Sequence, residues 1–579
     1  MFNTNSNLGK RNSSDEKRIS FLIWGAIFLT FFCSYELFSK SVLEHKNYLA
    51  MAKDQYIIEK QLPSSRGLIY FSDKNSYGGY YPMATNEDKY QVLVVPKNIK
   101  DKTSTAQQLA KILNIDEKEL FDAINNDKPY IPPIAKKQSK ETVANILGLK
   151  LDGVMIMAEK DRLYPEDNLA SQIVGFLDAE NVGRYGVEGY YNNNLTGKSG
   201  EIVGEKDIFG RFISEENKIN PQNGDNLYLT IDRNIQYMAM QYLNKNMSEM
   251  KADRGSIIIV EAKTGKIMAM ASNPDYNPNS YFDTAKDHPD YFTNPIISNE
   301  YEPGSIMKPI VMSMAIDSGK VQPDTEDIFG GSVTVQGYTI QNAMFRTFGK
   351  ETMTKVLENS DNVAMVWVSQ KLDFSEMRKY FEKYGFGKIT DIDLDGEAAG
   401  NLLAIDDWRD ISRATMAFGQ GVSVTPLQMV MAYQAIANEG KLMKPYIVDK
   451  IVKDNGDVVE TQPKQIEEVV SRETANKVKD MLVSVVDNGY DLQGKVAGYK
   501  VAGKTGTAQI PKSDGGYEET DTIHSFAGFL PANDPKYVVL IILNRPKKFN
   551  FASSTIAPYF SKIASWLLNY AEIKPTENQ

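Results

Sequence analysis

The most prominent hydrophobic pattern in the chain is a nearly unbroken apolar run at Ile19–Phe32. With residues 34–36 at the far membrane interface the run extends to Phe38, which gives the roughly 20 residues needed to span a bilayer. Basic side chains precede it, at Lys10, Arg11, Lys17 and Arg18. Because positive charge stays on the cytoplasmic side, the pattern predicts a cytoplasmic tail at 1–18, one helix at 19–38 that crosses the cytoplasmic (inner) membrane, and an extracytoplasmic remainder.

Two other interpretations of this run are weaker. A cleaved signal peptide needs a small-x-small site after the apolar core, and the segment 34–38 offers none. A lipid-modified Cys33 would need small residues before it, where Phe31 and Phe32 stand. Cys33 is also the only cysteine, so the chain can form neither an intramolecular disulfide nor a thiolate zinc site. We expect an uncleaved anchor with an inert thiol.

Residues 39–225 show a mixed pattern that predicts a separate N-terminal domain. The loop-forming segment Pro221–Asn226 separates it from a region of clearer periodicity. Two segments rich in turn residues and aromatics, Asp161–Pro165 and Gly183–Tyr190, contain no catalytic constellation, and we interpret them as packing elements. The pattern favours helices at 46–60, 105–113 and 117–125, a turn at 63–67 that leads into a short strand, and a strand at 90–95.

From residue 226 the periodicity predicts an α+β domain that ends near 571, followed by a disordered tail at 572–579. Because strands occur at both ends of this region, they have to meet in one sheet with the helical middle packed against it. We therefore expect an antiparallel sheet flanked by helices. The predicted elements are a strand at 227–231, a helix at 235–251, a hairpin of 255–260 and 266–270 that turns through 262–265, strands at 500–509, 525–530 and 536–543, and a closing helix at 556–570.

Composition and charge exclude some functions. The chain has 579 residues, 42% of them hydrophobic, which indicates a folded protein of two or more domains. A net charge of −10 argues against a nucleic-acid partner, since phosphate binding needs a basic face. No Gly-x-Ser-x-Gly nucleophile elbow accompanies the three histidines, His45, His288 and His524.

A candidate nucleophile lies at Ser305, directly after the turn-forming pair Pro303-Gly304. Apolar residues at i, i+4 and i+8 then predict a helix that Ser305 opens, where backbone N–H groups favour developing negative charge. Lys308 lies three residues on, so we expect its amine to reach the Ser305 hydroxyl. Lys308 can act as the base only when its pKa is lowered by burial or by a second cation, and we expect Lys504 to be that cation. Alone, Ser-x-x-Lys would indicate only an ordinary helix start with a solvated lysine.

Two further motifs follow in order along the chain. Ser360-Asp-Asn362 lies at a predicted helix junction, where alone it would indicate an N-cap. With Ser305 and Lys308, the Ser360 hydroxyl would relay a proton to the leaving amine, and the Asn362 amide would hold the substrate backbone and Lys308.

Lys504-Thr505-Gly506-Thr507 lies in a predicted strand, and alone it would indicate a strand end. We expect Lys504 and Thr505 to bind a terminal carboxylate and Gly506 to leave room for a substrate peptide along the strand edge. The backbone N–H groups of Ser305 and Thr507 would form the oxyanion hole.

Two rival interpretations use nearby residues. The segment 498–505 satisfies the phosphate-binding pattern Gly-x4-Gly-Lys-Thr, but a P-loop must open a helix, and helix-breaking residues follow closely. The site is also expected on the side of the membrane without ATP. Glu397, with Asn401 four residues on, resembles the glutamate that activates water in class A β-lactamases, although its Gly-rich setting predicts a turn.

Taken together, these motifs resemble the class B penicillin-binding proteins over nearly the whole chain. Arg66-Gly67, Arg162–Pro165 and Gly186–Gly189 look like that family's pedestal motifs, and Glu302 is similar to the septal branch. Asp361 departs from the serine that many members carry. No glycosyltransferase signature precedes residue 226, which argues against a bifunctional class A enzyme. The segments that carry the resemblance are Glu302–Pro309, Ser360–Asn362, Phe418–Gln428 and Lys504–Thr507.

The resemblance implies a penicillin-binding, β-lactamase-like transpeptidase domain on an elongated N-terminal pedestal, with no metal or cofactor. It implies that Ser305 attacks the penultimate D-alanine of a peptidoglycan stem peptide and that an amine from a neighbouring stem resolves the acyl-enzyme. β-Lactams would inhibit it, and a SEDS-type glycan polymerase and other division proteins would be its partners at the septum. An elongation-type transpeptidase, a D,D-carboxypeptidase and a non-catalytic division scaffold remain as alternatives.

Overall fold

The computed structural model describes residues 13–206, 212–512 and 515–576 and divides into two compact units. The first unit contains residues 1–64 and 198–222, and the second contains residues 65–197 and 223–579. Parts of the predicted tails, residues 1–12 and 577–579, lie outside the described residues.

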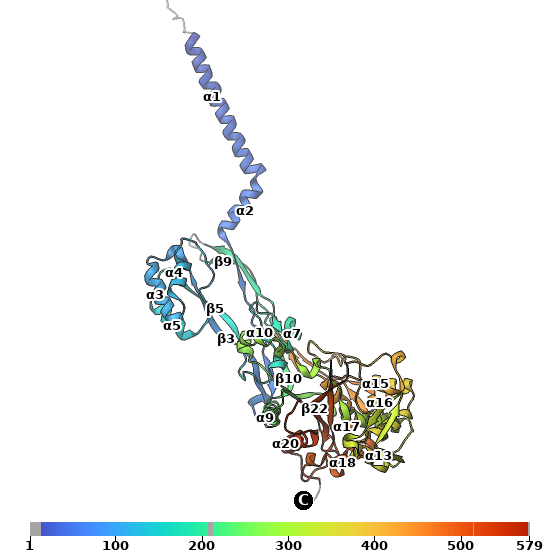
Figure 1. Ribbon diagram of the computed structural model, residues 1–579. Helices are drawn as coiled ribbons and strands as arrows, with labels where there is room; N and C mark the ends of the chain where they lie inside the picture. Colours follow the sequence, from blue (N-terminus) through green and yellow to red (C-terminus); the bar gives the residue numbers. More distant parts are fainter. Residues whose placement is uncertain (1–12, 207–211, 513–514, 577–579) are drawn as a thin grey trace, which may run out of the picture. The chain divides into compact units, whose positions relative to one another are not determined.

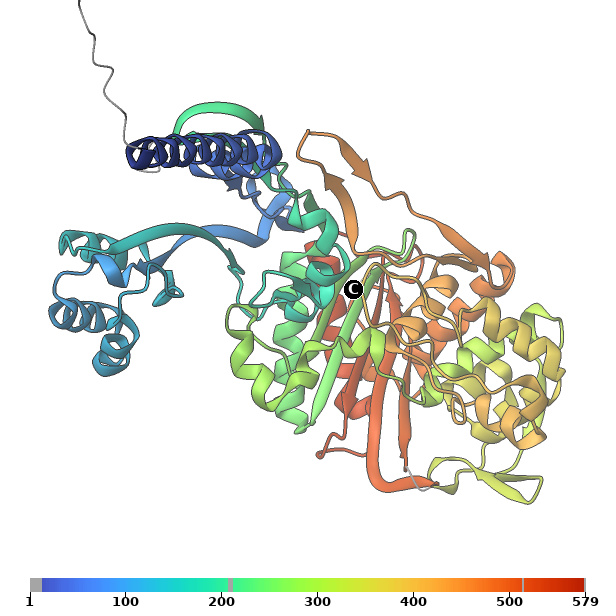
Figure 2. The same ribbon diagram turned by 90° about the horizontal axis from the view of Figure 1, so that it is seen from above.

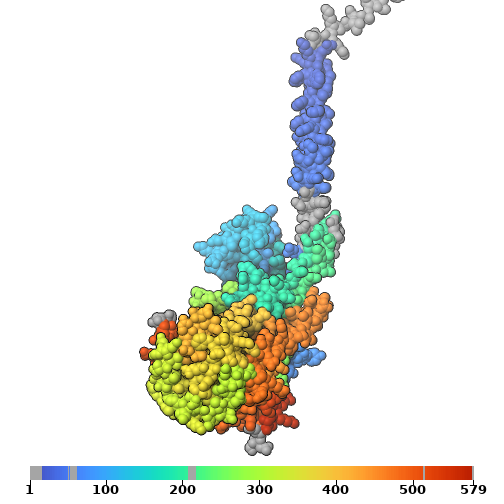
Figure 3. All heavy atoms as spheres, turned by 90° about the vertical axis from the view of Figure 1, so that its right-hand side faces the viewer, coloured from blue at the N-terminus to red at the C-terminus, as the bar shows by residue number. Residues whose placement is uncertain are grey.

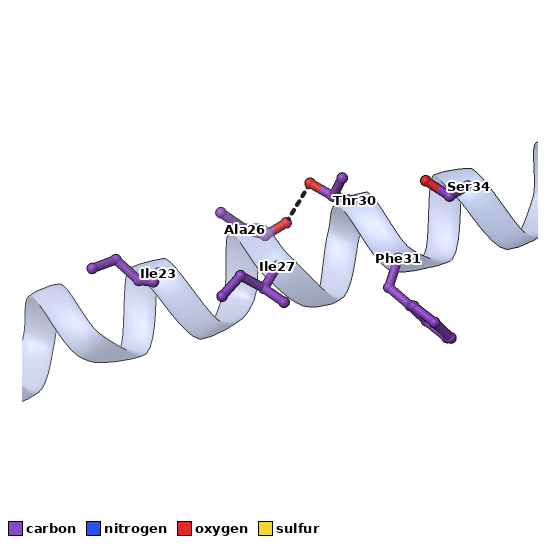
Figure 4. Close-up of a pocket in the computed structure, with 6 residues that line it drawn as sticks. All are labelled: Ile23, Ala26, Ile27, Thr30, Phe31 and Ser34. Carbon is purple, nitrogen blue, oxygen red and sulfur yellow. Dashed lines mark hydrogen bonds between the residues drawn. The ribbon is translucent and has the colours of Figure 1, made fainter.

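The first unit carries the predicted membrane segment as α1 (Ser13–Phe38). Its helical stretch Glu16–Leu43 is long and apolar enough to cross a membrane, and apolar side chains such as Phe21 cover its surface. The Thr30 hydroxyl donates to the Ala26 carbonyl oxygen at 2.8 Å, which satisfies this polar group within the helix, as lipid requires (Figure 4). The helix continues through a π-turn, η1 (Ser39–Leu43), and α2 (His45–Tyr56).

The rest of the first unit is a three-stranded antiparallel sheet with the order β1-β8-β9. The helix predicted at 46–60 was too long, because its last residues belong to β1. Register pairing places Glu59 opposite Val203. The bounds are β1 (Ile57–Leu62), β8 (Gly200–Lys206) and β9 (Phe212–Ile219).

The second unit contains a seven-stranded sheet built from distant parts of the sequence. Strand β10 (Asn226–Asp232), which the sequence places at the start of the C-terminal region, pairs in parallel with β2 and antiparallel with β18. The N-terminal and C-terminal regions therefore share one sheet. Its other strands are β2 (Ile69–Ser72), β3 (Tyr80–Val94), β4 (Ala135–Gln138), β5 (Val154–Leu163), β18 (Val448–Val452) and β19 (Val458–Glu460).

Short elements complete the N-terminal part of this unit. The helices predicted at 105–113 and 117–125 are confirmed as α3 (Lys102–Leu113) and α4 (Glu117–Ile124), which share a small apolar core with α5 (Lys140–Gly148) and β3. The remaining elements are η2 (Tyr77–Gly79), η3 (Pro96–Asn98), α6 (Ser171–Val174), β6 (Phe176–Leu177), β7 (Gly183–Arg184), α7 (Gly186–Tyr190) and α8 (Asn192–Thr196).

The predicted meeting of distant strands is confirmed by a five-stranded antiparallel sheet with the order β12-β11-β23-β22-β21. Figure 2 shows the green strands β11 and β12 beside the orange-red strands from the end of the chain. Strand β21 forms one edge. The bounds are β11 (Arg254–Glu261), β12 (Ile267–Asn273), β21 (Ala502–Pro511), β22 (Tyr517–Leu530) and β23 (Tyr537–Asn544).

Helices cover both faces of this sheet. Helices α9 (Arg233–Met250) and α20 (Ala557–Tyr570) lie on one side of β22, and α17 (Pro426–Ala437) and α18 (Arg472–Asn488) lie on the other (Figure 1). Every residue of α17 is buried. It is the central helix, and its start is fixed by Pro426 and by a capping box between Thr425 and Gln428.

The helical middle of the chain forms the surface that faces the viewer in Figure 3, in yellow to orange. Its elements include two hairpins, β13 (Glu326–Phe329) with β16 (Gly349–Thr352) and β14 (Ser332–Val335) with β15 (Tyr338–Gln341). The other elements of the unit are η4 (Pro278–Ser280), α10 (Tyr281–Asp287), η5 (Pro289–Phe292), α11 (Pro295–Ser298), η6 (Gly304–Met307), α12 (Lys308–Asp317), η7 (Ala343–Phe345), α13 (Met353–Glu358), α14 (Asn362–Gln370), α15 (Phe374–Lys383), η8 (Ile405–Asp407), α16 (Asp410–Met416), β17 (Lys441–Met443), β20 (Gln465–Glu468), η9 (Leu492–Gly494) and α19 (Ala552–Thr555).

The three N-terminal motifs meet in one buried ionic cluster. Glu188, with no exposed surface, accepts hydrogen bonds from Arg66 Nε and Arg162 Nε, each at 2.7 Å. Arg162 also donates to the Gly67 carbonyl oxygen at 2.8 Å and to Asn86 Oδ1 at 2.9 Å. One carboxylate therefore pairs with two guanidinium groups, and the segments of Arg162 and Glu188 pack together, as the sequence predicts.

We expect Glu188→Gln to lower the free energy of unfolding by about 3–5 kcal/mol, because two buried guanidinium groups lose their counter-ion. Denaturant unfolding of the full chain in detergent micelles measures the change. Glu326→Gln is the matched control, since its pair with Lys350 is largely exposed and contributes about 1 kcal/mol or less. Equal stability losses in the two variants would refute a special role for the buried cluster.

Candidate active site

Ser305 lies in η6, a 3₁₀ turn, and the α-helix α12 begins only at Lys308. The prediction that Ser305 opens a helix is therefore confirmed, with a first turn of 3₁₀ type that continues directly into α12. Pro309 explains where the α-helix begins, since proline has no N–H and fits only the first turn of a helix. Gly304, at φ +61°, turns the chain where a Cβ would lie 3.0 Å from the Cβ of Ala508.

The central helix holds this turn in place. The hydroxyl of Tyr433, on α17, donates to the Ile306 carbonyl oxygen at 2.9 Å. The Gly304 N–H donates to the Gly419 carbonyl oxygen at 3.1 Å. Glu302, immediately before the turn, accepts from the Gly421 N–H at 2.9 Å and the Tyr517 hydroxyl at 3.0 Å. These bonds tie the nucleophile turn to the loop that precedes α17.

A chain of hydrogen bonds connects the first two motifs. Lys308 Nζ donates to the Ser360 carbonyl oxygen at 2.6 Å and to Ser360 Oγ at 3.1 Å. Ser360 Oγ in turn donates to Ser305 Oγ at 3.1 Å. The sequence predicts a direct hydrogen bond between Lys308 and Ser305. Among the described residues, these two side chains are not directly bonded. The Ser360 hydroxyl bridges the Lys308 amine and the Ser305 hydroxyl instead.

The surroundings of Lys308 favour its neutral form. Its side chain has no exposed surface, and this burial lowers the pKa of Lys308 well below the ordinary lysine value. The positive charge of Lys504 lowers the pKa further, whereas the negative charge of Asp361 opposes both effects. Burial is the larger cause, so the predicted second cation assists it.

The second motif forms a sharp junction between α13 and α14. Ser360 adopts the left-handed conformation at φ +52°, and Asp361 caps α14 by accepting from the Ala364 N–H at 2.7 Å. Asn362 donates its side-chain amide to the Gln341 carbonyl oxygen at 2.9 Å. No hydrogen bond joins Asn362 to Lys308 among the described residues, so the structure does not contain this predicted contact. Asn362 supports the hairpin that ends at Gln341.

The third motif lies on the edge strand β21, and a buried carboxylate orders it. Asp491, with no exposed surface, lies 3.6 Å from Lys504 Nζ. It accepts from the Thr505 N–H at 2.9 Å and from the Thr505 hydroxyl at 2.5 Å. Sequence reasoning missed Asp491, because it lies in a loop without a motif or a periodic pattern. Lys504 itself is 1% exposed.

The edge of β21 facing away from β22 is the one nearest the nucleophile turn. Since Asp491 lies outside the sheet, the Thr505 N–H that it binds points to that outer edge. Backbone groups alternate along a strand, so the Thr507 N–H points to the same edge. A Cβ on Gly506 would lie 2.5 Å from Ser525 Oγ and 3.0 Å from the Pro303 carbonyl oxygen. Gly506 therefore allows the strand to pack against the turn, and its role beside the substrate stays a prediction.

The rival interpretations do not fit this geometry. Lys504 and Thr505 lie inside a β-strand, so the P-loop pattern does not open a helix. Glu397 accepts from the backbone N–H groups of Thr390 at 2.7 Å and Asp391 at 3.0 Å. Its carboxylate holds a loop.

Comparison with known proteins identifies a domain of the penicillin-binding proteins in each half of the chain. Residues 255–565 match the penicillin-binding protein transpeptidase domain, and residues 61–229 match the penicillin-binding protein dimerisation domain. Stage V sporulation protein D of Bacillus subtilis is 32% identical over 98% of this chain and 88% of its own length. Peptidoglycan D,D-transpeptidase FtsI of Escherichia coli is 30% identical over 89% of this chain and 85% of its own length.

Solved structures support the same assignment. Penicillin-binding protein 3 of Mycobacterium tuberculosis, complexed with aztreonam, has a TM-score of 0.69 at 27% identity and covers 90% of this chain and 98% of its own. A peptidoglycan synthetase from Bifidobacterium adolescentis has a TM-score of 0.73 at 25% identity, over 90% of this chain and 98% of its own. With the transpeptidase model matching more than half of its residues, the chain belongs to the class B penicillin-binding proteins.

Proposed function

We propose that this protein is a peptidoglycan D,D-transpeptidase that uses Ser305 as its nucleophile. The observation that carries the proposal is the hydrogen-bonded chain from Ser305 through Ser360 to the buried amine of Lys308. A serine hydroxyl needs a base to become a nucleophile, and a lysine with a lowered pKa supplies one where no histidine is at hand.

In the acylation step, Ser305 Oγ attacks the carbonyl carbon of the penultimate D-alanine in a stem peptide. Hydroxyl hydrogens rotate freely, so neutral Lys308 can accept the Ser360 proton while Ser360 accepts the proton of Ser305. The backbone N–H groups of Ser305 and Thr507 stabilise the oxyanion. The same relay, run in reverse, returns the proton to the leaving D-alanine amine.

The acyl-enzyme is then resolved by an amine from a neighbouring stem peptide, which restores the Ser305 hydroxyl. Lys504 supplies positive charge for the terminal carboxylate of the donor peptide, while Gly506 and Thr507 form the strand edge beside it. The Thr505 hydroxyl is engaged by Asp491, so it can donate to the substrate only by leaving that carboxylate. β-Lactams acylate the same serine.

We propose the domain bounds that the sequence indicates: a cytoplasmic tail at 1–18, an anchor at 19–38, a pedestal at 39–225, a transpeptidase domain at 226–571 and a tail at 572–579. The two family matches, at 61–229 and 255–565, support the division between the last two folded parts. The catalytic domain lies outside the cytoplasmic membrane in this scheme.

We propose that this chain belongs to the septal branch of the family. Glu302, the residue similar to that branch, is 9% exposed and joins the loop before α17 to β22. A SEDS-type glycan polymerase and other division proteins are the proposed partners, because a transpeptidase acts on newly polymerised glycan.

We expect Ser305→Ala to abolish covalent labelling by a fluorescent penicillin and to abolish cross-linking of stem peptides, because the attacking oxygen is gone. Gel fluorescence and mass spectrometry of the products measure the two effects. Ser298→Ala is the control, since that hydroxyl bonds only within and beside α11. Labelling that survives in Ser305→Ala would contradict the assignment of the nucleophile.

The wild-type products separate the alternatives. Cross-linked product in the presence of an added amine supports transpeptidation, whereas release of D-alanine by water alone would support a D,D-carboxypeptidase. Failure of the wild type to be labelled would favour a non-catalytic scaffold.

We expect Lys504→Met to move the acidic midpoint of the acylation rate to higher pH. The Lys504 charge lowers the pKa of Lys308, so its loss raises that pKa and leaves less neutral amine at a given pH. A shift of about one pH unit makes acylation roughly tenfold slower on the acidic limb. Rates of penicillin acylation across pH measure it, with Lys477→Met, a half-buried lysine paired with Glu473, as the control. An unchanged midpoint would exclude the coupling.

We expect the chain outside the anchor to be accessible from the extracytoplasmic side. On a Cys33→Ser background, Tyr77→Cys should react with a membrane-impermeant maleimide in intact cells, because Tyr77 is fully exposed. Lys17→Cys should react only after the membrane is opened. The opposite pattern of labelling would invert the proposed topology.

A further inference from the structure

The two oxyanion-hole donors of the proposed mechanism lie on separate parts of the fold. The Thr507 N–H belongs to β21 and so to the five-stranded sheet, whereas the Ser305 N–H belongs to the turn η6. Close backbone packing sets how near the two segments come, but among the described residues no hydrogen bond joins η6 to β21. Because hydrogen bonds are directional, a bond across this boundary would also fix the offset of the turn along the strand.

Glu302 makes such a bond. Its Oε2 accepts from the hydroxyl of Tyr517, the first residue of β22, at 3.0 Å, and its Oε1 accepts from the Gly421 N–H at 2.9 Å. Among the described residues, the other hydrogen-bond partners of the segment 301–308, beyond its own helix, lie in the loop before α17, in α17 or in the second motif. Tyr517 is therefore the partner of this segment on the sheet.

The bond between Glu302 and Tyr517 is strong and shielded from water. Glu302 is 9% exposed, and Tyr517 is half-buried. A hydroxyl that donates to a carboxylate forms a stronger bond than two neutral groups do. A second bond across the same boundary, from the Gln420 side-chain amide to Gln509 Oε1, is exposed and longer, at 3.4 Å. The Tyr517 hydroxyl is thus the better of the two connections.

The carboxylate-binding end of β21 is ordered separately. Asp491 binds the N–H and the hydroxyl of Thr505 and lies 3.6 Å from Lys504 Nζ. These bonds hold the groups proposed to recognise the terminal carboxylate of the donor, and neither Glu302 nor Tyr517 takes part in them. Recognition of the carboxylate and alignment of the oxyanion hole therefore depend on different side chains.

We propose that Tyr517 is a positioning residue for acylation: its bond to Glu302 holds the nucleophile turn in register with the sheet and so aligns the two oxyanion-hole donors. Without that bond both donors remain, but their offset is no longer fixed, and they stabilise the oxyanion less. The inference rests on the proposed function, and it adds a residue from β22 that belongs to none of the three motifs.

Tyr517→Phe tests the proposal, because it removes only the hydroxyl. The limiting rate constant of penicillin acylation should fall roughly 3–10-fold, less than the ~100-fold or more that follows deletion of a donor. The dissociation constant of the noncovalent penicillin complex should stay the same, since only the transition state loses stabilisation. Stopped-flow kinetics at increasing penicillin concentration separate the two constants.

Tyr559→Phe is the matched control, because its hydroxyl donates to Glu249 at 2.6 Å between α20 and α9. It should change neither constant. In a Glu302→Met background, Tyr517→Phe should slow acylation no further, since the acceptor is already gone. The proposal is overturned by an unchanged rate constant in Tyr517→Phe, by a dissociation constant that rises as much as the rate falls, or by a full additional loss in the double variant.

A second measurement needs no substrate. Amide hydrogen exchange of the full chain in micelles, read by mass spectrometry, should be faster across residues 301–308 in Tyr517→Phe than in the wild type and in Tyr559→Phe. Equal exchange in all three would overturn the proposal. Failure of the wild type to react with penicillin would instead reject the proposed function, while the exchange rates would still decide whether Tyr517 holds the turn.

Discussion

Burial of the Lys308 amine is the constraint on which the active site depends. A lysine in water is protonated at neutral pH and cannot accept a proton from serine. The fold removes water from Lys308 completely and replaces it with the Ser360 carbonyl and hydroxyl oxygens. Because the neutral amine keeps these hydrogen bonds, burial changes the protonation state without leaving an unsatisfied group. The chemistry proposed for Ser305 follows from this one desolvated side chain.

The buried site exists only when distant parts of the chain close into one sheet. Strands β11 and β12 come from the start of the domain, and β21 to β23 come from its end. Closure brings β21 against the nucleophile turn, where Gly304 and Gly506 remove the side chains that would keep the backbones apart. The fully buried helix α17 fixes the turn from the other side through Tyr433. The distance between the first and third motifs is thus set by backbone packing and not by flexible loops.

Much of this arrangement could be predicted from the sequence, and the rest could not for identifiable reasons. Short continuous apolar runs, such as those of β11 and β23, mark strands that are buried on both faces, so the central sheet and its hairpin were predictable. The partner of a strand is not encoded in such a run, and the pairing of β10 with β2 was missed. The motif residues have a fixed order and spacing, whereas Asp491 reaches the site from a loop. Only the folded chain brings this carboxylate to Lys504, the lysine that it faces.

The proposed acylation reaction makes two opposing demands on Lys308. The amine must be neutral before attack and positively charged after it has accepted the proton. Burial and the charge of Lys504 meet the first demand, but both also destabilise the ammonium that forms next. Asp361 is the group near Lys308 that acts in the opposite direction. A carboxylate held by the N-terminus of α14 reorganises little during the reaction, so its charge is available when the ammonium forms. Burial, one fixed cation and one fixed anion therefore together set the pH range in which we propose that Ser305 reacts.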